Sequence, residues 1–144
     1  MNTIVNPVLG ILDAYKASVF AKDVDAFLAL YDRNVHVFDM WCAWSHAGID
    51  AWRDMAVDWF SSLGTDRVVV GFDDVQMVET SGLAFIHAFV TYKGLSADGM
   101  ELRAMNNRMT LALKQVDGIW KVIHQHTSAP VNHETLTATL KRTR

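Results

Sequence analysis

Four long runs of β-branched and aromatic residues fill the second half of the sequence, and short turn signals separate them. The runs cover residues 67–78, 83–95, 100–116 and 119–128. The turn sequences between successive runs are ETSG, SADG and DG, in this order along the chain. Runs of this composition between Gly, Asp and Ser residues are typical of β-strands. We therefore predict a meander of four long antiparallel strands.

The Asp117-Gly118 turn predicts the register of the last hairpin. A two-residue Asp-Gly loop is typical of a type I′ turn, so that Val116 should pair with Ile119. Strict alternation then puts six side chains on one face of the sheet: Arg108, Thr110, Ala112, Ile123, Gln125 and Thr127. The opposite face would carry Met109, Leu111, Leu113, Val122, His124 and His126. A looser register through SADG would bring His87 beside Arg108 and Phe85 beside Thr110.

The first half of the sequence predicts helices. Apolar residues recur at three- and four-residue steps between Ile4 and Ala21, and Asp23 is a candidate N-cap for a second, shorter helix. A short strand follows at residues 34–39, and a third helix should run from Gly48 to Gly64. Helices first and strands later predict an α+β domain, with the helices against one face of a curved sheet.

Composition narrows the class of protein. A chain of 144 residues has the length of a single domain, and its net charge of −3 argues against nucleic-acid binding. The basic residues Lys141, Arg142 and Arg144 form a terminal tail that we expect to be solvated. A lone cysteine, Cys42, excludes an intrachain disulfide and fits the cytoplasm. We expect no signal peptide and no membrane association, because the N-terminus lacks a basic region and no apolar run approaches about 20 residues.

Residues 39–46, DMWCAWSH, are too apolar for an ordinary surface loop. The core, a partner chain or a small molecule must cover these aromatic residues. The loop sequence leaves all three alternatives open.

The order of these elements resembles the nuclear transport factor 2-like superfamily. The stretch DAYKASVFAKDVDAFLALYDRNVHVFD resembles the opening of its SnoaL-like and ketosteroid isomerase branch. The ending RMTLALKQVDGIWKVIHQHTSAPV resembles the last hairpin of SnoaL-like proteins and of the calmodulin-dependent kinase association domain. The resemblance implies one SnoaL-like domain over residues 1–144, with a cone-shaped fold in which three N-terminal helices pack on a strongly curved antiparallel sheet.

The resemblance also implies roles for single residues. Tyr15 matches the oxyanion-hole tyrosine of ketosteroid isomerases and Asp39 matches their general base. Arg108 matches a pocket arginine of association domains. The second oxyanion acid of the isomerases falls near Thr110 and is missing, and the second pocket arginine of the association domains falls at Thr127. In such a fold the DMWCAWSH loop lies at the mouth of the cone, so that Trp41 and Trp44 would form the rim of a pocket.

The residues themselves allow other interpretations. Asp39 is either a partly buried base or the N-cap of the next turn, and Tyr15 is either a ligand contact or a core aromatic. An arginine within an apolar strand must pair with an acid, for which Asp39 is the candidate, or with a bound anion. The His124 and His126 pair lacks a third metal ligand, so we predict no metal site.

Two classes of function follow. The first is a small-molecule-binding protein that acts as a cofactor-free isomerase, cyclase or dehydratase/hydrolase, with Asp39 as base and Tyr15 and Arg108 polarising the carbonyl of an apolar substrate. The predicted ligand-binding residues are Trp41, Trp44, Trp59, His87, Thr110, Gln125 and Thr127. The alternative is a non-catalytic ligand-binding or oligomerisation module of the association-domain type. We also predict a homodimer through the convex face of the sheet, an apolar surface that no helix would cover, made of Ile86, Ala88, Val90, Met109, Leu111 and Val122.

Overall fold

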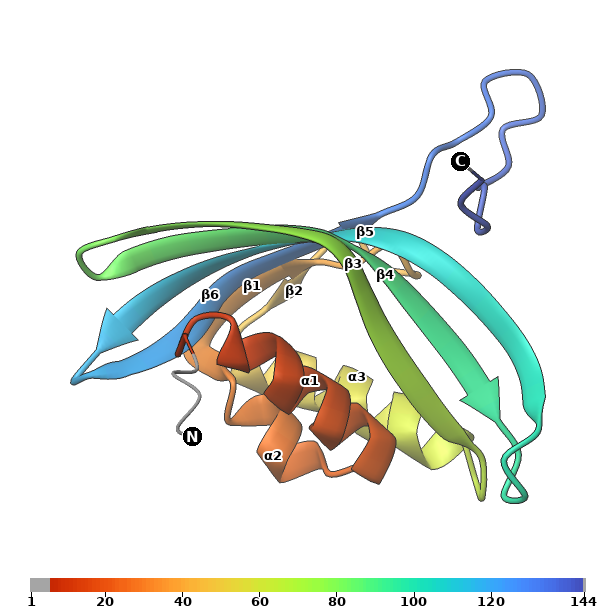
Figure 1. Cartoon of the computed structure of the whole chain (residues 1–144), viewed down its shortest axis with the longest axis horizontal. Coiled ribbons are helices and arrows are strands. Elements are labelled where there is room, and N and C mark those ends of the chain that lie inside the picture. Colours follow the sequence, from red (N-terminus) through yellow and green to blue (C-terminus); the bar gives the residue numbers. More distant parts are fainter. Residues whose placement is uncertain (1–5, 144) are drawn as a thin grey trace, which may run out of the picture.

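A six-stranded sheet curves over three helices, which all lie on its concave side (Figure 1). The computed structural model describes residues 6–143. The helices are α1 (Gly10–Ala21), α2 (Val24–Leu28) and α3 (Ile49–Ser62). The strands are β1 (Tyr31–Phe38), β2 (His46–Ala47), β3 (Arg67–Thr80), β4 (Leu83–Leu95), β5 (Glu101–Val116) and β6 (Ile119–Ser128). The predicted α+β class, with helices on one face of a curved sheet, is confirmed.

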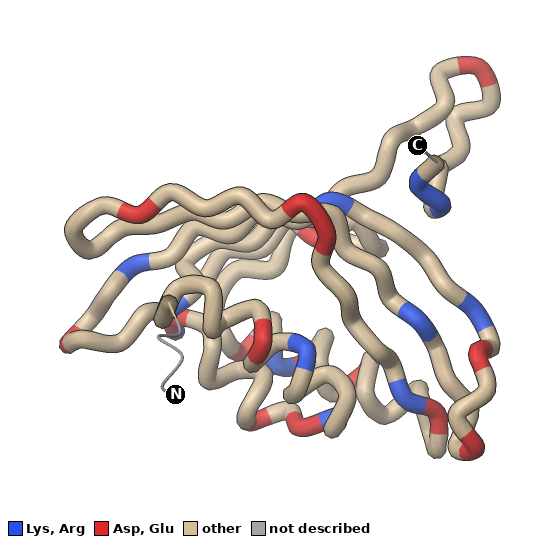
Figure 2. Tube along the Cα trace, viewed as in Figure 1, with Lys and Arg blue, Asp and Glu red and all other residues tan. Residues whose placement is uncertain are grey.

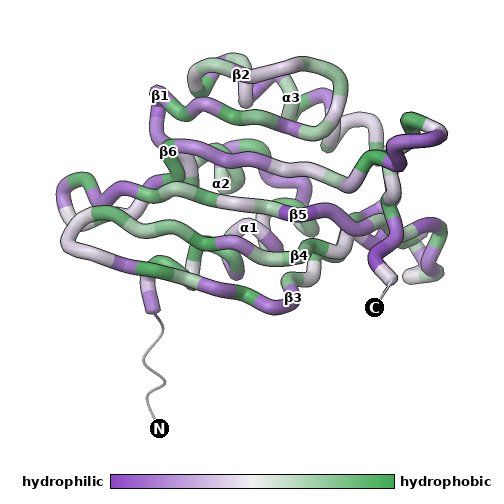
Figure 3. Tube along the Cα trace, turned by 90° about the horizontal axis from the view of Figure 1, so that it is seen from above, coloured by the Kyte–Doolittle hydropathy of each residue, from purple (hydrophilic) through white to green (hydrophobic). Residues whose placement is uncertain are grey.

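The sheet is mixed rather than purely antiparallel. Its strand order is β2-β1-β6-β5-β4-β3, which Figure 3 shows from the side away from the helices. The four long strands form the predicted antiparallel meander, and β1 joins the edge of β6 in parallel. None of the helices within residues 6–143 has the length and apolar character needed to cross a membrane.

The helix ends follow from local hydrogen bonds. The helix predicted from Ile4 begins at Gly10, after a turn in which Asn6 Oδ1 accepts the backbone N–H of Val8 at 2.8 Å; Ile4 itself lies outside the described residues. Asp23 caps α2 as predicted, because its Oδ1 accepts the N–H of Ala26 at 3.0 Å. Gly48 opens α3 with a φ of +89°, a conformation that a side chain would strain.

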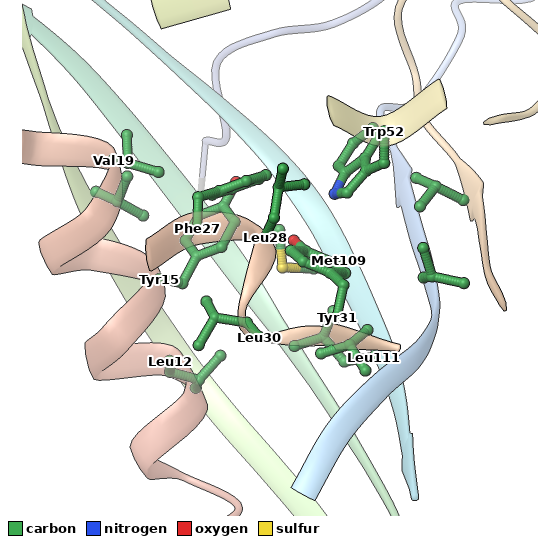
Figure 4. Close-up of a cluster of buried hydrophobic side chains, with 14 of the residues drawn as sticks. Leu12, Tyr15, Val19, Phe27, Leu28, Leu30, Tyr31, Trp52, Met109 and Leu111 are labelled. Carbon is green, nitrogen blue, oxygen red and sulfur yellow. The ribbon is translucent and has the colours of Figure 1, made fainter. Parts of the chain in front are cut away.

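Aromatic residues join the three helices to the sheet (Figure 4). The Phe27 ring of α2 lies 5.6 Å from that of Tyr15 on α1, 5.2 Å from that of Tyr31 on β1 and 6.1 Å from that of Trp52 on α3. Phe27 is fully buried and Trp52 is 2% exposed. Ring pairs at these distances add to the stabilisation that burial provides.

The predicted register of the last hairpin is right at the turn and wrong beyond it. Asp117 and Gly118 both have positive φ, as a type I′ turn requires, and Val116 pairs with Ile119. Leu113 still pairs with Val122, but Ala112 pairs with His124. Ile123 is therefore an extra residue, a β-bulge that shifts every later pair by one residue.

This bulge reverses the predicted faces. Gln125 pairs with Leu111, and Thr127 pairs with Met109. All four side chains are buried on the concave side of the sheet. Arg108 pairs with Ser128 and Thr110 with His126, all on the convex side, which we call the outer face. The residues predicted to share one face therefore lie on both faces of the sheet.

The residues predicted to form the dimer surface share one face, but this is the concave face rather than the convex one. They are at most 8% exposed, because they face the helices of their own chain: Ile86, Ala88, Val90, Met109, Leu111 and Val122. Helices cover the concave face, so the apolar residues there need no partner chain. His87 pairs with Thr110 and Phe85 with Ala112, so the predicted pairing of His87 with Arg108 is also wrong.

Residues 129–143 form an arm that leaves the end of β6 and projects from the sheet (Figure 1). Val131 pairs with Ala138 across a small hairpin, and Thr139 N–H donates to the Pro130 carbonyl at 2.8 Å. The chain then returns toward the sheet, where the N–H of Asn106 on β5 donates to the Leu140 carbonyl at 2.7 Å. The backbone of Leu140 and Arg142 is therefore bonded to β5, while the side chains of Lys141 and Arg142 are exposed, as expected; Arg144 lies outside the described residues.

Candidate functional site

A cavity of about 950 Å³ lies between α1, α3 and the concave face of the sheet. Most of its lining is apolar or aromatic, which suits an organic ligand. Its principal side chains are Tyr15, Asp39, Trp41, His46, Trp52, Met55, Trp59, Tyr92, Asn107, Gln125 and Thr127. Elements from both halves of the chain therefore build one site.

Asp39 follows β1 directly, where the strand ends and the chain turns into the rim loop. The Thr127 hydroxyl donates to Asp39 Oδ1 at 2.9 Å and accepts the Met40 N–H at 2.9 Å. Because that hydroxyl accepts from the amide, its single proton is directed to the carboxylate. Asp39 is thus held at the cavity wall by a β6 residue that the bulge has turned inward.

The environment of Asp39 favours a base. Burial raises the pKa of Asp39, and the Thr127 hydrogen bond, the His46 charge and the Met40 amide only partly oppose this rise. A carboxylate with a raised pKa binds a proton more strongly than an exposed one does. Such a group is better matched to proton abstraction near neutral pH.

Two tyrosines form a hydroxyl pair in the cavity wall. Tyr15 Oη on α1 and Tyr92 Oη on β4 lie 3.0 Å apart. Burial raises the pKa of Tyr15 well above its ordinary value and that of Tyr92 to about 12, with the Asp39 charge as a further cause for both. Both hydroxyls are therefore protonated at neutral pH. One proton bridges the pair, and the other remains to donate to a ligand oxygen.

Gln125 is fixed from the opposite side. Tyr31 Oη donates to Gln125 Oε1 at 2.6 Å, and both side chains are buried. Burial raises the pKa of Tyr31 as well, so that this hydroxyl stays a donor. The contact orients the Gln125 amide at the cavity wall.

Two further lining residues have buried polar atoms with no hydrogen-bond partner among residues 6–143. These atoms are Trp52 Nε1 and Asn107 Oδ1. Folded proteins leave few such groups, and functional sites account for a share of them. Both belong to the cavity wall, which is consistent with a site rather than a filled core.

The rim loop carries the two tryptophans of the DMWCAWSH stretch in different settings. Trp41 is 48% exposed and lines the cavity, whereas Trp44 is 99% exposed and does not. Between them Ala43 N–H donates to the Trp41 carbonyl at 2.9 Å around Cys42, whose φ is +64°. This is a tight turn of a strained kind. Cys42 is exposed.

Three predicted site residues lie on the outer face, away from the cavity: Arg108, His87 and Thr110. Arg108 Nε donates to Ser128 Oγ at 3.0 Å and does not reach Asp39. The His87 ring instead stacks on Phe85 at 6.2 Å. The predicted convergence of Arg108 with Asp39 and Tyr15 is therefore not what the structure shows.

The cavity also contains residues that the sequence analysis did not select. Tyr92, His46 and Asn107 all line it. Tyr92 shares a face of β4 with the buried residues Val90 and Ala88, so alternation could have identified it once that face was assigned to the core. His46 sits in the two-residue strand β2, which gives too short a pattern to place a side chain.

The histidines of the outer face form a loose cluster around Phe38. The rings of His124 and His126 lie 4.9 Å and 5.6 Å from that of Phe38. Within residues 6–143 no group of three or more His, Cys, Asp or Glu side chains is arranged to hold a metal ion.

A curved sheet and three helices enclose a mainly apolar cavity, and its wall contains a half-buried carboxylate and neutral hydroxyls. These features define the cone-shaped α+β class of pocket domains. The chain belongs to the SnoaL-like domain family, whose model matches residues 8–132.

Solved structures show the same fold. A nuclear transport factor 2-like protein of unknown function from Pseudomonas putida is 22% identical, with a TM-score of 0.83 over 95% of this chain and 94% of that one. A calcium/calmodulin-dependent protein kinase II association domain assigned in Xanthomonas campestris is 15% identical, with a TM-score of 0.72 over 90% and 89% of the two chains.

A ketosteroid isomerase-like protein from Erwinia carotovora is 16% identical, with a TM-score of 0.67 over 89% of this chain and 97% of that one. At these identities the likeness concerns the fold alone. No curated protein matches the chain at the sequence level.

Proposed function

We propose that the protein binds an apolar small molecule with a carbonyl group in this cavity and transfers a proton on it, with Asp39 as the base. The observation that supports this most is a carboxylate with a raised pKa at the wall of a large apolar cavity, within electrostatic range of the Tyr15 and Tyr92 hydroxyls. No cofactor is needed for this chemistry.

Side chains of the cavity supply both the base and the hydrogen-bond donor that the proposed reaction needs. The Asp39 carboxylate removes a proton from the carbon next to the carbonyl, and the electron pair of that C–H bond moves to the carbonyl oxygen. The free proton of the Tyr15–Tyr92 pair forms a hydrogen bond to the resulting enolate. Return of the proton to a different carbon gives an isomerase. Attack of the enolate carbon on a second carbonyl, whose oxygen then takes the proton from Asp39, gives a cyclase. Loss of a neighbouring hydroxyl, which leaves as water with that proton, gives a dehydratase.

The Tyr92 hydroxyl takes the polarising role that the sequence analysis gave to Arg108. Because its pKa is raised, the Tyr92 hydroxyl keeps its proton and can donate a hydrogen bond to an enolate oxygen without bringing a full charge into the cavity. Trp41, Trp59 and Trp52 would cover the apolar body of the ligand.

A library of cyclic ketones and acids, titrated against tryptophan fluorescence, tests binding first, because three of the five tryptophans line the cavity. Asp39→Asn should then keep the affinity for a bound ketone and lose turnover by roughly 10²-fold or more. Asp58→Asn, the same change at another cavity residue, is the control and should keep both. The proposal is contradicted if no compound of the library binds to the protein at millimolar concentration.

The alternative function is a non-catalytic binding or oligomerisation module, which the likeness to an association-domain fold favours. In that case ligands bind, but the native protein changes none of them, and Asp39→Asn alters affinity rather than a rate.

We also propose a homodimer through the outer face, the convex face expected from the sequence, but with other residues than those predicted to form it. Its exposed apolar residues are not covered by any described helix, and they include Phe38, Phe85 and Val78. The outer faces of two copies would bury these side chains against each other.

A further inference from the structure

The C-terminal arm brings basic side chains to the outer face of the sheet at a fixed position. The side chain of Asn106 on β5 is the anchor: its Oδ1 accepts the Arg142 N–H at 2.9 Å and its Nδ2 donates to Thr91 Oγ1 at 2.8 Å. Together with the bond from Asn106 N–H to Leu140, these contacts hold the end of the arm against β5. In Figure 2 this basic end of the arm is coloured blue beside the C label.

A pocket of about 190 Å³ lies between the arm and the sheet. Its lining within the described residues includes three basic side chains, those of Arg108, Lys141 and Arg142, and no acidic one. None of these three forms an ion pair with a carboxylate among residues 6–143. Asp73 pairs with Phe89 from β3, and Arg108 pairs with Phe89 from β5, so that Phe89 lies between the acid and the arginine.

Uncharged partners hold both guanidinium groups in place. Arg142 Cζ lies 3.7 Å from the centroid of the Phe89 ring, and Phe89 is the cross-strand neighbour of Arg108. Arg108 Nε donates to Ser128 Oγ at 3.0 Å. Arg142 uses one face of its guanidinium for the Phe89 ring, and Arg108 uses one N–H donor for Ser128. The other N–H groups of both side chains are left for a ligand.

The pocket gathers three positive charges that no carboxylate among residues 6–143 balances. The arm adds the charges of Lys141 and Arg142 to that of Arg108, and like charges repel. An oxyanion between the guanidiniums would reverse the sign of this interaction and add charge-assisted hydrogen bonds. We propose that the pocket between the arm and the outer face binds a small oxyanion, a phosphate or carboxylate group, between Arg108 and Arg142.

This site is separate from the cavity of Asp39, because it lies on the other face of the sheet, and it does not depend on the proposed function. Its size admits a single oxyanion group with a short substituent. The arginine that the sequence analysis expected to pair with an acid or a bound anion would thus have its partner here.

Titration calorimetry with inorganic phosphate, at an ionic strength held constant with sodium chloride, tests the proposal. We expect saturable binding, which Arg108→Gln and Arg142→Gln each weaken by at least roughly tenfold. Arg108 lies within β5, so its substitution leaves the contacts of the arm in place. Lys114→Gln, which removes a charge from the same strand and face, is the control and should bind phosphate as the native protein does.

Parallel titrations with acetate and methyl phosphate identify which oxyanion is preferred. Binding no stronger than that of chloride would overturn the proposal. An equal loss in Lys114→Gln would do so as well, because it would show attraction by overall charge rather than by a site.

Discussion

Asp39 is held in the cavity wall by contacts with opposite effects on its proton affinity. Burial raises its pKa, and the hydrogen bond from Thr127 lowers it, so that the Thr127 hydroxyl limits how far the pKa rises. Burial thus determines the direction of the pKa shift of the proposed base, and a neighbouring residue that need not touch the substrate limits it.

Thr127→Val should shift the acid limb of the pH–rate profile to higher pH. The substitution keeps the shape of the side chain and removes the donor that stabilises the charged carboxylate, so the pKa of Asp39 should rise further. The profile of kcat/KM against pH measures the shift. Thr110→Val, the same change on the outer face, should leave the profile in place, and equal profiles for all three proteins would contradict the role of Thr127.

Asp39→Asn should raise the thermal stability at neutral pH. Because the folded-state pKa is raised, the contribution of Asp39 to stability is complete below its unfolded-state pKa and is lost as pH rises through the folded-state value. The asparagine avoids the cost of a buried charge. Thermal denaturation should show a higher midpoint than the native protein at neutral pH and no such gain in acid; a lower midpoint at neutral pH would contradict the assignment.

At the level of elements, the β-bulge at Ile123 determines which β6 residues reach the cavity. The Asp-Gly turn and the composition of the strands made the meander predictable from the sequence, because both are local signals. The bulge has no such signal: Ile123, His124 and Gln125 fit either face of a strand by composition. A one-residue shift exchanges the faces, so the error at one position displaced Arg108 and Thr110 from the predicted site.

Some site residues could be predicted from the sequence, and others could not. The resemblance to ketosteroid isomerases indicated Tyr15, on the first helix, and Asp39, directly after the first strand, and both line one cavity. Tyr92 could not be assigned, because its place depends on the faces of strands whose register is fixed by long-range pairing. The catalytic roles of all three remain predictions.

Trp52 carries the packing between α3 and the rest of the core, and its removal tests that packing. Trp52→Ala should lower the free energy of unfolding by about 3–5 kcal/mol, since the side chain is 2% exposed and contacts the rings of Phe27 and Tyr31. Urea denaturation measures the change. Trp44→Ala, at a residue that is 99% exposed, should alter it by less than about 0.5 kcal/mol.

At the scale of the whole molecule, the two faces of the sheet have different tasks. The concave face and the helices enclose the cavity, and the outer face presents aromatic side chains and the arm to solvent or to a partner. A dimer through the outer face would leave the mouth of the cavity open, because the rim loop belongs to the other side of the sheet.

Light scattering at micromolar concentration should find twice the chain mass. Phe85→Glu puts a charge into the proposed interface and should give monomers, whereas Val57→Glu, at an exposed position on α3, should not. A native protein that is monomeric at this concentration would contradict the dimer.

The most direct test of the central claim is hydrogen–deuterium exchange on a bound ketone, followed by NMR in heavy water. If Asp39 is the base, the native protein should accelerate exchange at the carbon beside the carbonyl of a ketone that binds in the cavity. Asp39→Asn should lose this acceleration by roughly 10²-fold or more while it still binds the ketone, and Asp58→Asn should retain it. Equal exchange rates with the native protein and with Asp39→Asn would contradict the claim that Asp39 transfers protons.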